Sequence, residues 1–262
     1  MLLLHVIILG IVEGITEFLP ISSTAHIEFA TKLLGIIPTD FVKSFTIVIQ
    51  LGAILAVVML YREKLLKSKK AWQNIIVGFV PTGIIGFVLY KIIKHFLLGN
   101  VWIAAVMLVI GGIAMVILEK NFSRRGNESF SVKSIEDLSL REMVTLGVIQ
   151  SLAVIPGVSR SGALVIGGVS MNIPRAVIVE TAFLLAIPTM AAATGYDLLK
   201  TGISFTGNEW IMLGVGTVVA GAVAFVVAKW LLRYIAKHDF TLFGWYRIIA
   251  GIVLLIVFLV IT

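Results

Sequence analysis

The sequence predicts an all-α polytopic membrane protein, with six transmembrane helices and two re-entrant helix-loop-helix segments arranged as an inverted-topology repeat. Three observations support this fold class. The composition is strongly apolar, six long segments are almost free of charge, and two polar segments are each interrupted by a proline.

The apolar composition places the chain in a bilayer. Of the 262 residues, 59% are hydrophobic and only 13% are charged, whereas a soluble domain is nearer half apolar and a quarter charged. Apolar stretches of about 20 residues are long enough to cross a membrane as helices. The predicted spans are Ser44–Leu60, Asn74–Tyr90, Val101–Leu118, Val177–Leu198, Trp210–Ala228 and Leu242–Ile261. The absence of cysteine excludes disulfides and thiolate metal sites.

Basic residues concentrate in two loops, Tyr61–Gln73 and Lys120–Arg141, which fall on the same side if the six spans alternate. The positive-inside rule makes this side cytoplasmic. An even number of spans then puts both termini outside. The formal net charge of +7 would suggest nucleic acid for a soluble protein, but these loops account for it, so we expect no nucleic-acid partner.

A weak internal repeat relates the two halves of the chain. A shift of 137 residues lays Gly10-Ile-Val-Glu-Gly-Ile over Gly147-Val-Ile-Gln-Ser-Leu, and Pro20-Ile-Ser-Ser-Thr over Gly157-Val-Ser-Arg-Ser. Each match is weak alone. The order of features is the stronger signal, because a polar segment followed by three spans occurs twice.

The two polar segments are predicted to enter the membrane, break and return. Pro20 and Pro156 each end an apolar helix, and non-helical backbone at membrane depth is tolerated only inside protein or beside a cavity. The predicted half-helices are Leu2–Leu19 with Ser22–Leu34, and Arg141–Ile155 with Ser159–Met171. Since a re-entrant pair does not cross, the second repeat starts on the opposite face, and the two breaks should meet tip to tip.

These features define one integral membrane domain over residues 1–262. The first inverted repeat covers residues 1–119 and the second covers residues 141–262, each with a re-entrant pair and three spans. A cytoplasmic loop over residues 120–140 connects them.

Glu13 and Glu17 lie one helical turn apart, and so share one helix face. Two carboxylates in an apolar segment are costly in lipid, which makes them functional candidates. A pair on a solvated face is disfavoured, because Leu2–Ile11 is so apolar. Paired carboxylates can bind a divalent cation or share general acid–base work.

Ser22, Ser23 and His26 follow the first break. One helical turn should bring the His26 ring near a serine hydroxyl, and histidine can take the proton of a hydroxyl or itself attack phosphorus. Capping of the second half-helix is the alternative role for either serine, and it stays open.

The second break has the composition of a phosphate site. Gly157 and Gly162 allow close approach of backbone to a ligand, and Ser159 and Ser161 add hydroxyl donors. The helix that begins near Ser159 directs free N–H groups at the break, which favours an anion. Arg160 adds a permanently charged fork suited to phosphate oxygens. The first break is acidic and the second basic, so the two should complement each other.

The segments Glu13–His26 and Pro156–Gly162 resemble the two sequence motifs of the undecaprenyl-diphosphate phosphatase family, known also for bacitracin resistance. The resemblance covers nearly the whole chain. It implies a multi-pass protein of the bacterial inner membrane that hydrolyses undecaprenyl diphosphate to undecaprenyl phosphate, the recycled carrier of cell-wall precursors. It also implies Mg²⁺ or Ca²⁺ and a site open to the outer, periplasmic face. Leu164 stands where family members often have threonine, which puts one minor phosphate contact in doubt.

The residues and the resemblance together predict a division of labour. Glu13 and Glu17 would be the acidic pair and hold the cation. Ser22, Ser23 and His26 would supply the nucleophile and the proton-transfer group, with Ser23 favoured as nucleophile and His26 as its base or as a direct attacker. The groups expected to hold the diphosphate are Gly157, Ser159, Arg160, Ser161 and Gly162.

Two alternatives are weighed against the phosphatase. Inverted repeats with broken helices also suit a lipid-phosphate flippase or a secondary transporter, but carboxylates, serine–histidine and a phosphate cradle together favour bond cleavage. A purely structural membrane protein would not need these charges at membrane depth. The partners expected are the polyprenyl diphosphate substrate and the lipid bilayer, and a homodimer remains an open alternative.

Overall fold

The computed structural model describes residues 1–92, 100–123, 133–201 and 205–261, and within them all regular structure is helical. The elements are α1 (Leu3–Thr16), α2 (Ser23–Leu33), α3 (Asp40–Val48), α4 (Gln50–Leu60), α5 (Arg62–Lys67), α6 (Lys69–Ile92), α7 (Val101–Ser123), η2 (Ile135–Asp137), α8 (Leu140–Gln150), η3 (Ser151–Val154), α9 (Arg160–Ser170), α10 (Arg175–Thr201), α11 (Gly207–Ile235) and α12 (Thr241–Ile261).

Among the described residues, six segments are long and apolar enough to cross a membrane, which confirms the prediction of a polytopic helical membrane protein. The first combines α3 and α4, which meet at Ile49, and the others lie in α6, α7, α10, α11 and α12. The shorter helix α1 is equally apolar but has only 14 residues. The predicted connecting loop over residues 120–140 is described in part, because residues 124–132 lie outside the described residues.

Four short helices form where the sequence predicts half-helices. Helices α1 and α2 flank a turn at residues 17–22, here called the first turn, and α8 and α9 flank a turn at residues 155–159, the second turn. Helix α1 ends three residues before its predicted limit, because the backbone leaves the helix ahead of Pro20. Ser22 and Ser159, each directly before the second helix of its pair, have positive φ angles of 72° and 68°.

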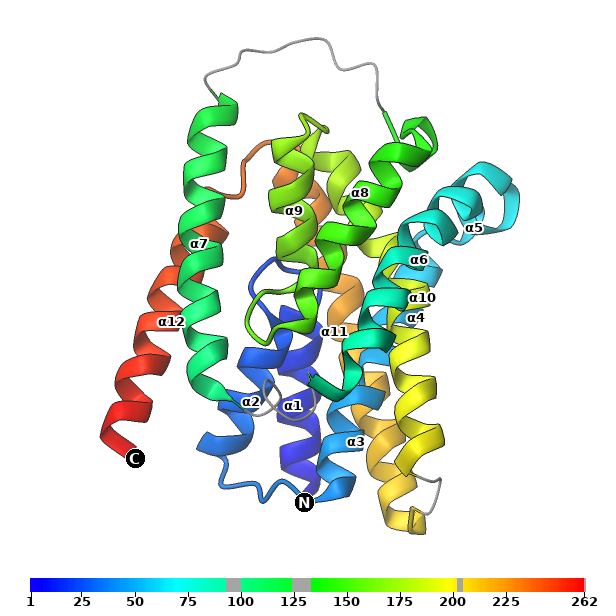
Figure 1. The fold of residues 1–262 in the computed structure, drawn as a ribbon. Helices are drawn as coiled ribbons and strands as arrows, with labels where there is room; N and C mark the ends of the chain where they lie inside the picture. Colours follow the sequence, from blue (N-terminus) through cyan, green and yellow to red (C-terminus); the bar gives the residue numbers. More distant parts are fainter. Residues whose placement is uncertain (93–99, 124–132, 202–204, 262) are drawn as a thin grey trace.

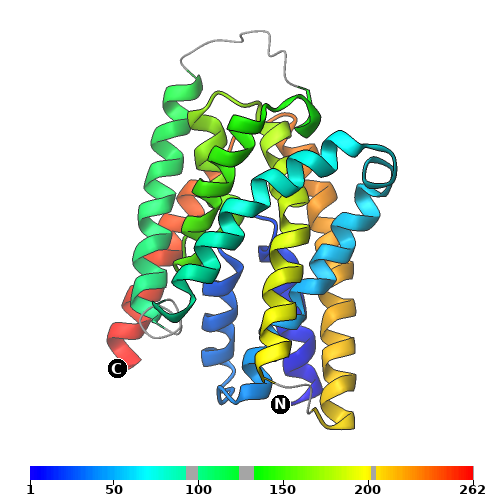
Figure 2. The same cartoon turned by 45° about the vertical axis from the view of Figure 1, so that its right-hand side comes forward.

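The two pairs approach each other from opposite ends of the bundle (Figures 1 and 2). Helix α1 runs inward from the end that carries the N-terminus, and α2 returns to that end. Helix α8 runs inward from the other end, where α5 lies, and α9 returns to it. The two turns therefore meet near the middle of the molecule, while the N-terminus and the end of α12 lie at the same end (Figure 1).

Close helix packing holds this arrangement. Helix α1 packs on α11, α8 on α6, and α7 along α12. A Cβ atom on Gly147 would lie 2.1 Å from the carbonyl oxygen of Gly78, so the α8 and α6 backbones touch. Gly112 and Gly168 also permit close helix approach, since a Cβ on Gly112 would lie 2.6 Å from the Gly244 carbonyl oxygen and one on Gly168 would lie 2.1 Å from Ile178. Small residues at such crossings let two helices pack closely. In a membrane this close packing, rather than the hydrophobic effect, drives helix association.

Polar contacts join the loop segments at the α5 end. Lys64 forms ion pairs with Glu180 and with Glu136, the latter at 3.5 Å. The Asn74 amide on α6 donates to the carbonyl oxygens of Ile135 and Leu138, at 2.7 and 2.9 Å. These bonds fix η2 and the start of α8 against α6, and so set the angle at which α8 enters the bundle.

Candidate active site

The two turns enclose a pocket of about 200 Å³. Its walls come from the two turns, from α4 and α6, and from α10. The expected site residues that line it are Glu17, Ser22, Ser23, Gly157, Ser159 and Arg160. The structure thus brings the acidic and the basic segments together, as the repeat predicted.

Glu17 bridges the two turns. The Ser23 hydroxyl donates a hydrogen bond to Oε2 of Glu17 at 2.5 Å. The Arg160 guanidinium donates from Nη2 to the other oxygen, Oε1, at 3.2 Å. Both charged side chains are almost fully buried, with 5% of Glu17 and 10% of Arg160 exposed. One carboxylate therefore orients a hydroxyl and balances a buried cation at the same time.

Glu13 lies one turn earlier on α1 and is only 1% exposed. Its Oε1 atom is buried and has no hydrogen-bond partner among the described residues. A buried carboxylate oxygen without a partner is costly, so it marks a position where a further group is expected. The described part of the chain holds no group of three or more His, Cys, Asp or Glu side chains that could bind a metal. A cation bound by Glu13 and Glu17 would therefore need further ligands beyond this acidic pair.

Arg160 carries unused donors. Its Nε and Nη1 atoms are buried without a partner in the described structure, while Nη2 is held by Glu17. Arg160 is also the first residue of α9, where backbone N–H groups and the helix dipole favour an anion. Two oriented guanidinium donors at a helix N-terminus can bind a phosphate group through charge-assisted bonds.

The other polar groups of the second turn bind one another. The Ser159 hydroxyl caps α9 by accepting from the Gly162 N–H at 3.1 Å, and it lies 3.1 Å from the Ser161 hydroxyl. Ser161 donates to the carbonyl oxygen of Leu19 in the first turn, at 3.0 Å. Ser161, at the start of α9, thus links the second helix pair to the first turn. The Gly162 N–H already donates to the Ser159 hydroxyl.

His26 makes contacts that differ from those expected. Its Nδ1 donates to the Ser22 carbonyl oxygen at 2.8 Å, and Nε2 lies 2.7 Å from the Tyr246 hydroxyl. Neither partner is a serine hydroxyl, because the ring reaches back one turn of α2 to the main chain. In a neutral ring Nε2 therefore accepts from Tyr246. His26 holds the backbone of Ser22, whose positive φ is unusual for a residue other than glycine.

Arg247 of α12 was not identified from the sequence. It is fully buried and donates to the carbonyl oxygens of Pro20 in the first turn and of Gly157 and Val158 in the second, each at 3.0 Å. Gly162 leaves room for it, since a Cβ there would lie 2.5 Å from Nη1. An arginine inside the apolar span Leu242–Ile261 was the available signal, because such charges are rarely without a role.

A second group of uncharged side chains lines the pocket opposite the turns. The Gln150 amide donates to the hydroxyls of Thr82 and Thr189, at 2.9 and 3.3 Å. Thr82 in turn donates to the Gly147 carbonyl oxygen at 2.7 Å. Gln50 also lines the pocket. Gln150 therefore supports the wall of the site through its bonds to Thr82 and Thr189.

Comparison with known proteins places the chain among membrane phosphatases. The family model for bacitracin resistance protein BacA matches residues 6–253. A protein named undecaprenyl-diphosphatase from Aquifex aeolicus is 51% identical over 94% of this chain and 95% of its own length. Proteins of the same name from Sulfurihydrogenibium and Persephonella marina are 47% and 45% identical, each over 95% of this chain and 96% of their own length.

Proposed function

We propose that this chain, which belongs to the family of bacitracin resistance protein BacA, hydrolyses undecaprenyl diphosphate to undecaprenyl phosphate and orthophosphate. The reaction recycles the lipid carrier of cell-wall synthesis and gives resistance to bacitracin. The flippase or transporter alternative has no support from the relatives, all of which carry the name of a phosphatase.

One observation carries the proposal. A nucleophile, a carboxylate and a phosphate-binding cation are joined in one pocket, because Glu17 contacts both the Ser23 hydroxyl and the Arg160 guanidinium. A hydroxyl that already donates to a carboxylate has a path for its proton when it attacks an electrophile. The arginine provides the opposite charge for the phosphate that approaches this hydroxyl.

The reaction proceeds in two displacements. Ser23 Oγ attacks the terminal phosphorus, its proton passes to Glu17, and the bond from phosphorus to the bridging oxygen breaks to release undecaprenyl phosphate. Water then attacks the phosphoserine. The serine oxygen recovers the proton from Glu17, and both protons of the water leave with orthophosphate as H₂PO₄⁻. Glu17 takes the place of His26 as base, because the Ser23 hydroxyl donates to Glu17, whereas His26 contacts the Ser22 carbonyl oxygen and the Tyr246 hydroxyl.

Arg160 and the start of α9 hold the diphosphate. The unpaired Nε and Nη1 atoms and the backbone N–H groups of Arg160 and Ser161 face the charge that shifts between the terminal and leaving oxygens. Gly157 lets the second turn lie directly against α7, since a Cβ there would lie 2.1 Å from the Ala104 carbonyl oxygen. Ser159, Ser161 and Gly162 maintain the shape of this cradle.

A divalent cation, Mg²⁺ or Ca²⁺, fits the acidic pair. The buried, unpartnered oxygen of Glu13 is a ready ligand, and Glu17 follows one turn later on the same face. Mg²⁺ is commonly held by one or two carboxylates together with substrate phosphates and water, which suits a site without a third acidic ligand. When bound, the cation supplies positive charge to the diphosphate oxygens.

Ser22 and His26 position the nucleophile. His26 binds the Ser22 carbonyl oxygen, and the left-handed conformation of Ser22 directs the chain into α2 with Ser23 as its first residue. Ser22 and His26 remain the alternative nucleophiles. Trapping and sequencing a phosphorylated residue separates the three, and a phosphohistidine would overturn the assignment of Ser23.

We also infer that the two helix pairs are re-entrant and related as inverted repeats. Two of the three described non-glycine residues with positive φ, Ser22 and Ser159, are 159 − 22 = 137 residues apart, which is the shift of the sequence repeat. The same shift carries α2, Ser23–Leu33, onto α9, Arg160–Ser170. The pairs enter from opposite ends (Figure 1). This supports repeats at residues 1–119 and 141–262 within one domain.

The inferred location is the bacterial inner membrane, with the basic α5 end in the cytoplasm. Both termini lie at the opposite end and so outside, and the site receives its lipid from the outer leaflet. Whether two copies pair in the membrane is a separate property, and the proposed reaction needs residues of one copy only.

Phosphate release from undecaprenyl diphosphate by the purified protein tests the activity. We expect orthophosphate to appear at a rate proportional to enzyme, to stop with a chelator, and to resume when Mg²⁺ or Ca²⁺ is restored. Transport of labelled lipid without phosphate release would overturn the hydrolase in favour of a flippase.

A further inference from the structure

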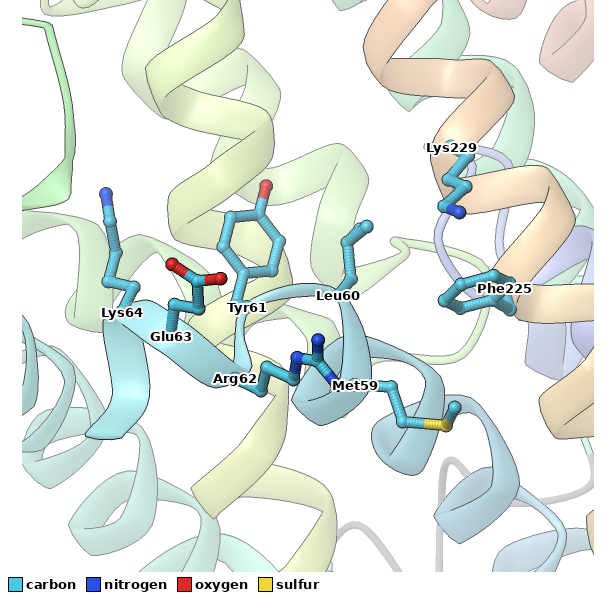
Figure 3. Close-up of a pocket in the computed structure, with 8 residues that line it drawn as sticks. All are labelled: Met59, Leu60, Tyr61, Arg62, Glu63, Lys64, Phe225 and Lys229. Atoms are coloured by element: carbon cyan, nitrogen blue, oxygen red, sulfur yellow. The ribbon is translucent and has the colours of Figure 1, made fainter. Parts of the chain in front are cut away.

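A second, larger pocket lies at the basic α5 end of the molecule, whereas the two turns lie near its middle. It has a volume of about 640 Å³ between the α4–α5 corner and α11. The residues that line it are Met59, Leu60, Tyr61, Arg62, Glu63, Lys64, Phe225 and Lys229 (Figure 3). None of them belongs to the candidate active site.

Two cations in this pocket lack a carboxylate partner in the described part of the chain. Arg62 and Lys229 take part in no ion pair there, and Lys229 lies 4.2 Å above the centre of the Phe225 ring. Figure 3 shows Arg62 pointing into the gap between α4 and α11, towards the side that carries Phe225 and Lys229. The pocket therefore presents two available positive charges from two different helices.

The remaining charges of the pocket are already balanced. Lys64 points to the other side of α5 and pairs with Glu180 and Glu136 (Figure 3). Glu63, the one acidic lining residue, pairs with the exposed Lys67 at 3.7 Å. The net preference of the pocket is thus for an anion held by Arg62 and Lys229.

An exposed apolar surface continues from these cations towards the middle of the bundle. On α4, Met59 is 64% and Leu55 57% exposed, one turn apart. On α11, Val218 is 70% exposed and lies on the same helix face as Phe225 and Lys229, at spacings of seven and eleven residues. In a membrane-spanning protein this surface meets lipid chains, and Trp230, 46% exposed beside Lys229, is typical of the membrane interface.

We propose that this pocket binds the phosphate headgroup of an anionic glycerophospholipid from the leaflet at the α5 end, with its acyl chains along α4 and α11. Basic pockets between transmembrane helices on this side are suited to such headgroups, whereas a soluble phosphate would have no use for the apolar track. The site is independent of the hydrolytic reaction, since it shares no residue with it.

Native mass spectrometry of the purified protein with equimolar phosphatidylglycerol and phosphatidylcholine of identical chains tests the proposal. Each cation contributes about 1 kcal/mol near a membrane surface, roughly fivefold, so the two cations together correspond to roughly a 30-fold preference for the anionic lipid. We expect wild type to retain phosphatidylglycerol preferentially, and the double variant Arg62→Gln/Lys229→Gln to lose this preference. The charge-retaining Arg62→Lys/Lys229→Arg should keep it, which separates binding from misfolding.

The matched control is Lys69→Gln/Lys120→Gln, which removes two exposed charges outside the pocket, and should leave the preference unchanged. Equal loss in this control would mean that general surface charge attracts the lipid, and would overturn the site. Displacement of phosphatidylglycerol by millimolar glycerol 3-phosphate would also overturn it, in favour of a soluble phosphate ligand.

Discussion

Nη2 of Arg160 lies 3.2 Å from Oε1 of Glu17, so that the first residue of α9 meets the turn after α1 across 143 residues of sequence. Both groups are buried, and removal of either leaves the other as an uncompensated charge. This ion pair joins the two halves of the molecule at the point where the proposed chemistry occurs.

Glu17→Gln should lower the rate of phosphate release by about 10³-fold, because the amide cannot take the proton of Ser23. The measurement is orthophosphate release at saturating substrate. Glu63→Gln is the matched control, since Glu63 is an exposed glutamate outside the active-site pocket and should leave the rate unchanged. Near-normal activity of Glu17→Gln would remove Glu17 from the mechanism.

Ser23→Ala should abolish both turnover and the trapped phosphoenzyme, whereas Ser22→Ala should keep a measurable rate. Ser23 carries the hydroxyl that donates to Glu17, while Ser22 contributes a backbone carbonyl oxygen to His26. Rapid acid quench with labelled substrate, followed by peptide sequencing, gives the site of labelling. A phosphorylated peptide that persists in Ser23→Ala would place the nucleophile elsewhere.

Glu13→Gln should raise the concentration of Mg²⁺ needed for half-maximal activity, because it removes a charged oxygen that has no partner among the described residues. The rate is measured across a series of free Mg²⁺ concentrations buffered with a chelator. Recovery at high Mg²⁺ is expected. An unchanged Mg²⁺ dependence would show that Glu13 is not a ligand.

Arg247→Met should destabilise the protein and disorder both turns. The substitution leaves the carbonyl oxygens of Pro20, Gly157 and Val158 without a buried donor, at a cost of about 1–3 kcal/mol for each group. Thermal unfolding in detergent should show a lower midpoint, with Arg141→Gln, an exposed arginine at the start of α8, as control. Equal midpoints for wild type and Arg247→Met would contradict the role of Arg247.

Ionisation of Glu136 should make the stability of the protein depend on pH in the acidic range. A hydrogen bond from Ser68 and the charge of Lys64 lower the pKa of Glu136 from its usual value of 4.5. A lowered folded-state pKa contributes stability above the unfolded pKa, and this contribution is lost as pH falls through the folded value. Glu136→Gln should thus lower the unfolding midpoint slightly at pH 7, and the difference should shrink progressively as pH falls below the usual value of 4.5. A difference that stays constant across this acidic range would exclude this cause.

The sequence predicted the helices better than the contacts between side chains. Apolar length and proline breaks are local properties, so the six spans and the four short helices lie where expected, although individual ends differ by up to seven residues, as at the end of α11. The meeting of Glu17 and Arg160 followed from the repeat and from opposite charge. These parts rest on periodicity and electrostatics, which a single sequence contains.

The remaining contacts depend on tertiary packing. The direction of the His26 ring is set by Tyr246, 220 residues away, and by the backbone of Ser22, neither of which a local pattern reveals. Arg247 reaches three carbonyl oxygens of the two turns, and two more on α7, from a helix that seemed to be an ordinary span. Main-chain acceptors have no sequence signature, so such contacts emerge only in three dimensions.

The Arg247 contacts also bear on how the site could be altered by design. All three of its bonds to the turns end on carbonyl oxygens, a group that every amino acid possesses. The side chain at Val158 can thus be exchanged without removing an acceptor from this arginine, whereas Gly157 has no room for a Cβ beside the Ala104 backbone. A library that varies Thr24, which lines the active-site pocket, around an intact Arg247 is a practical starting point for enzymes that accept other lipid diphosphates.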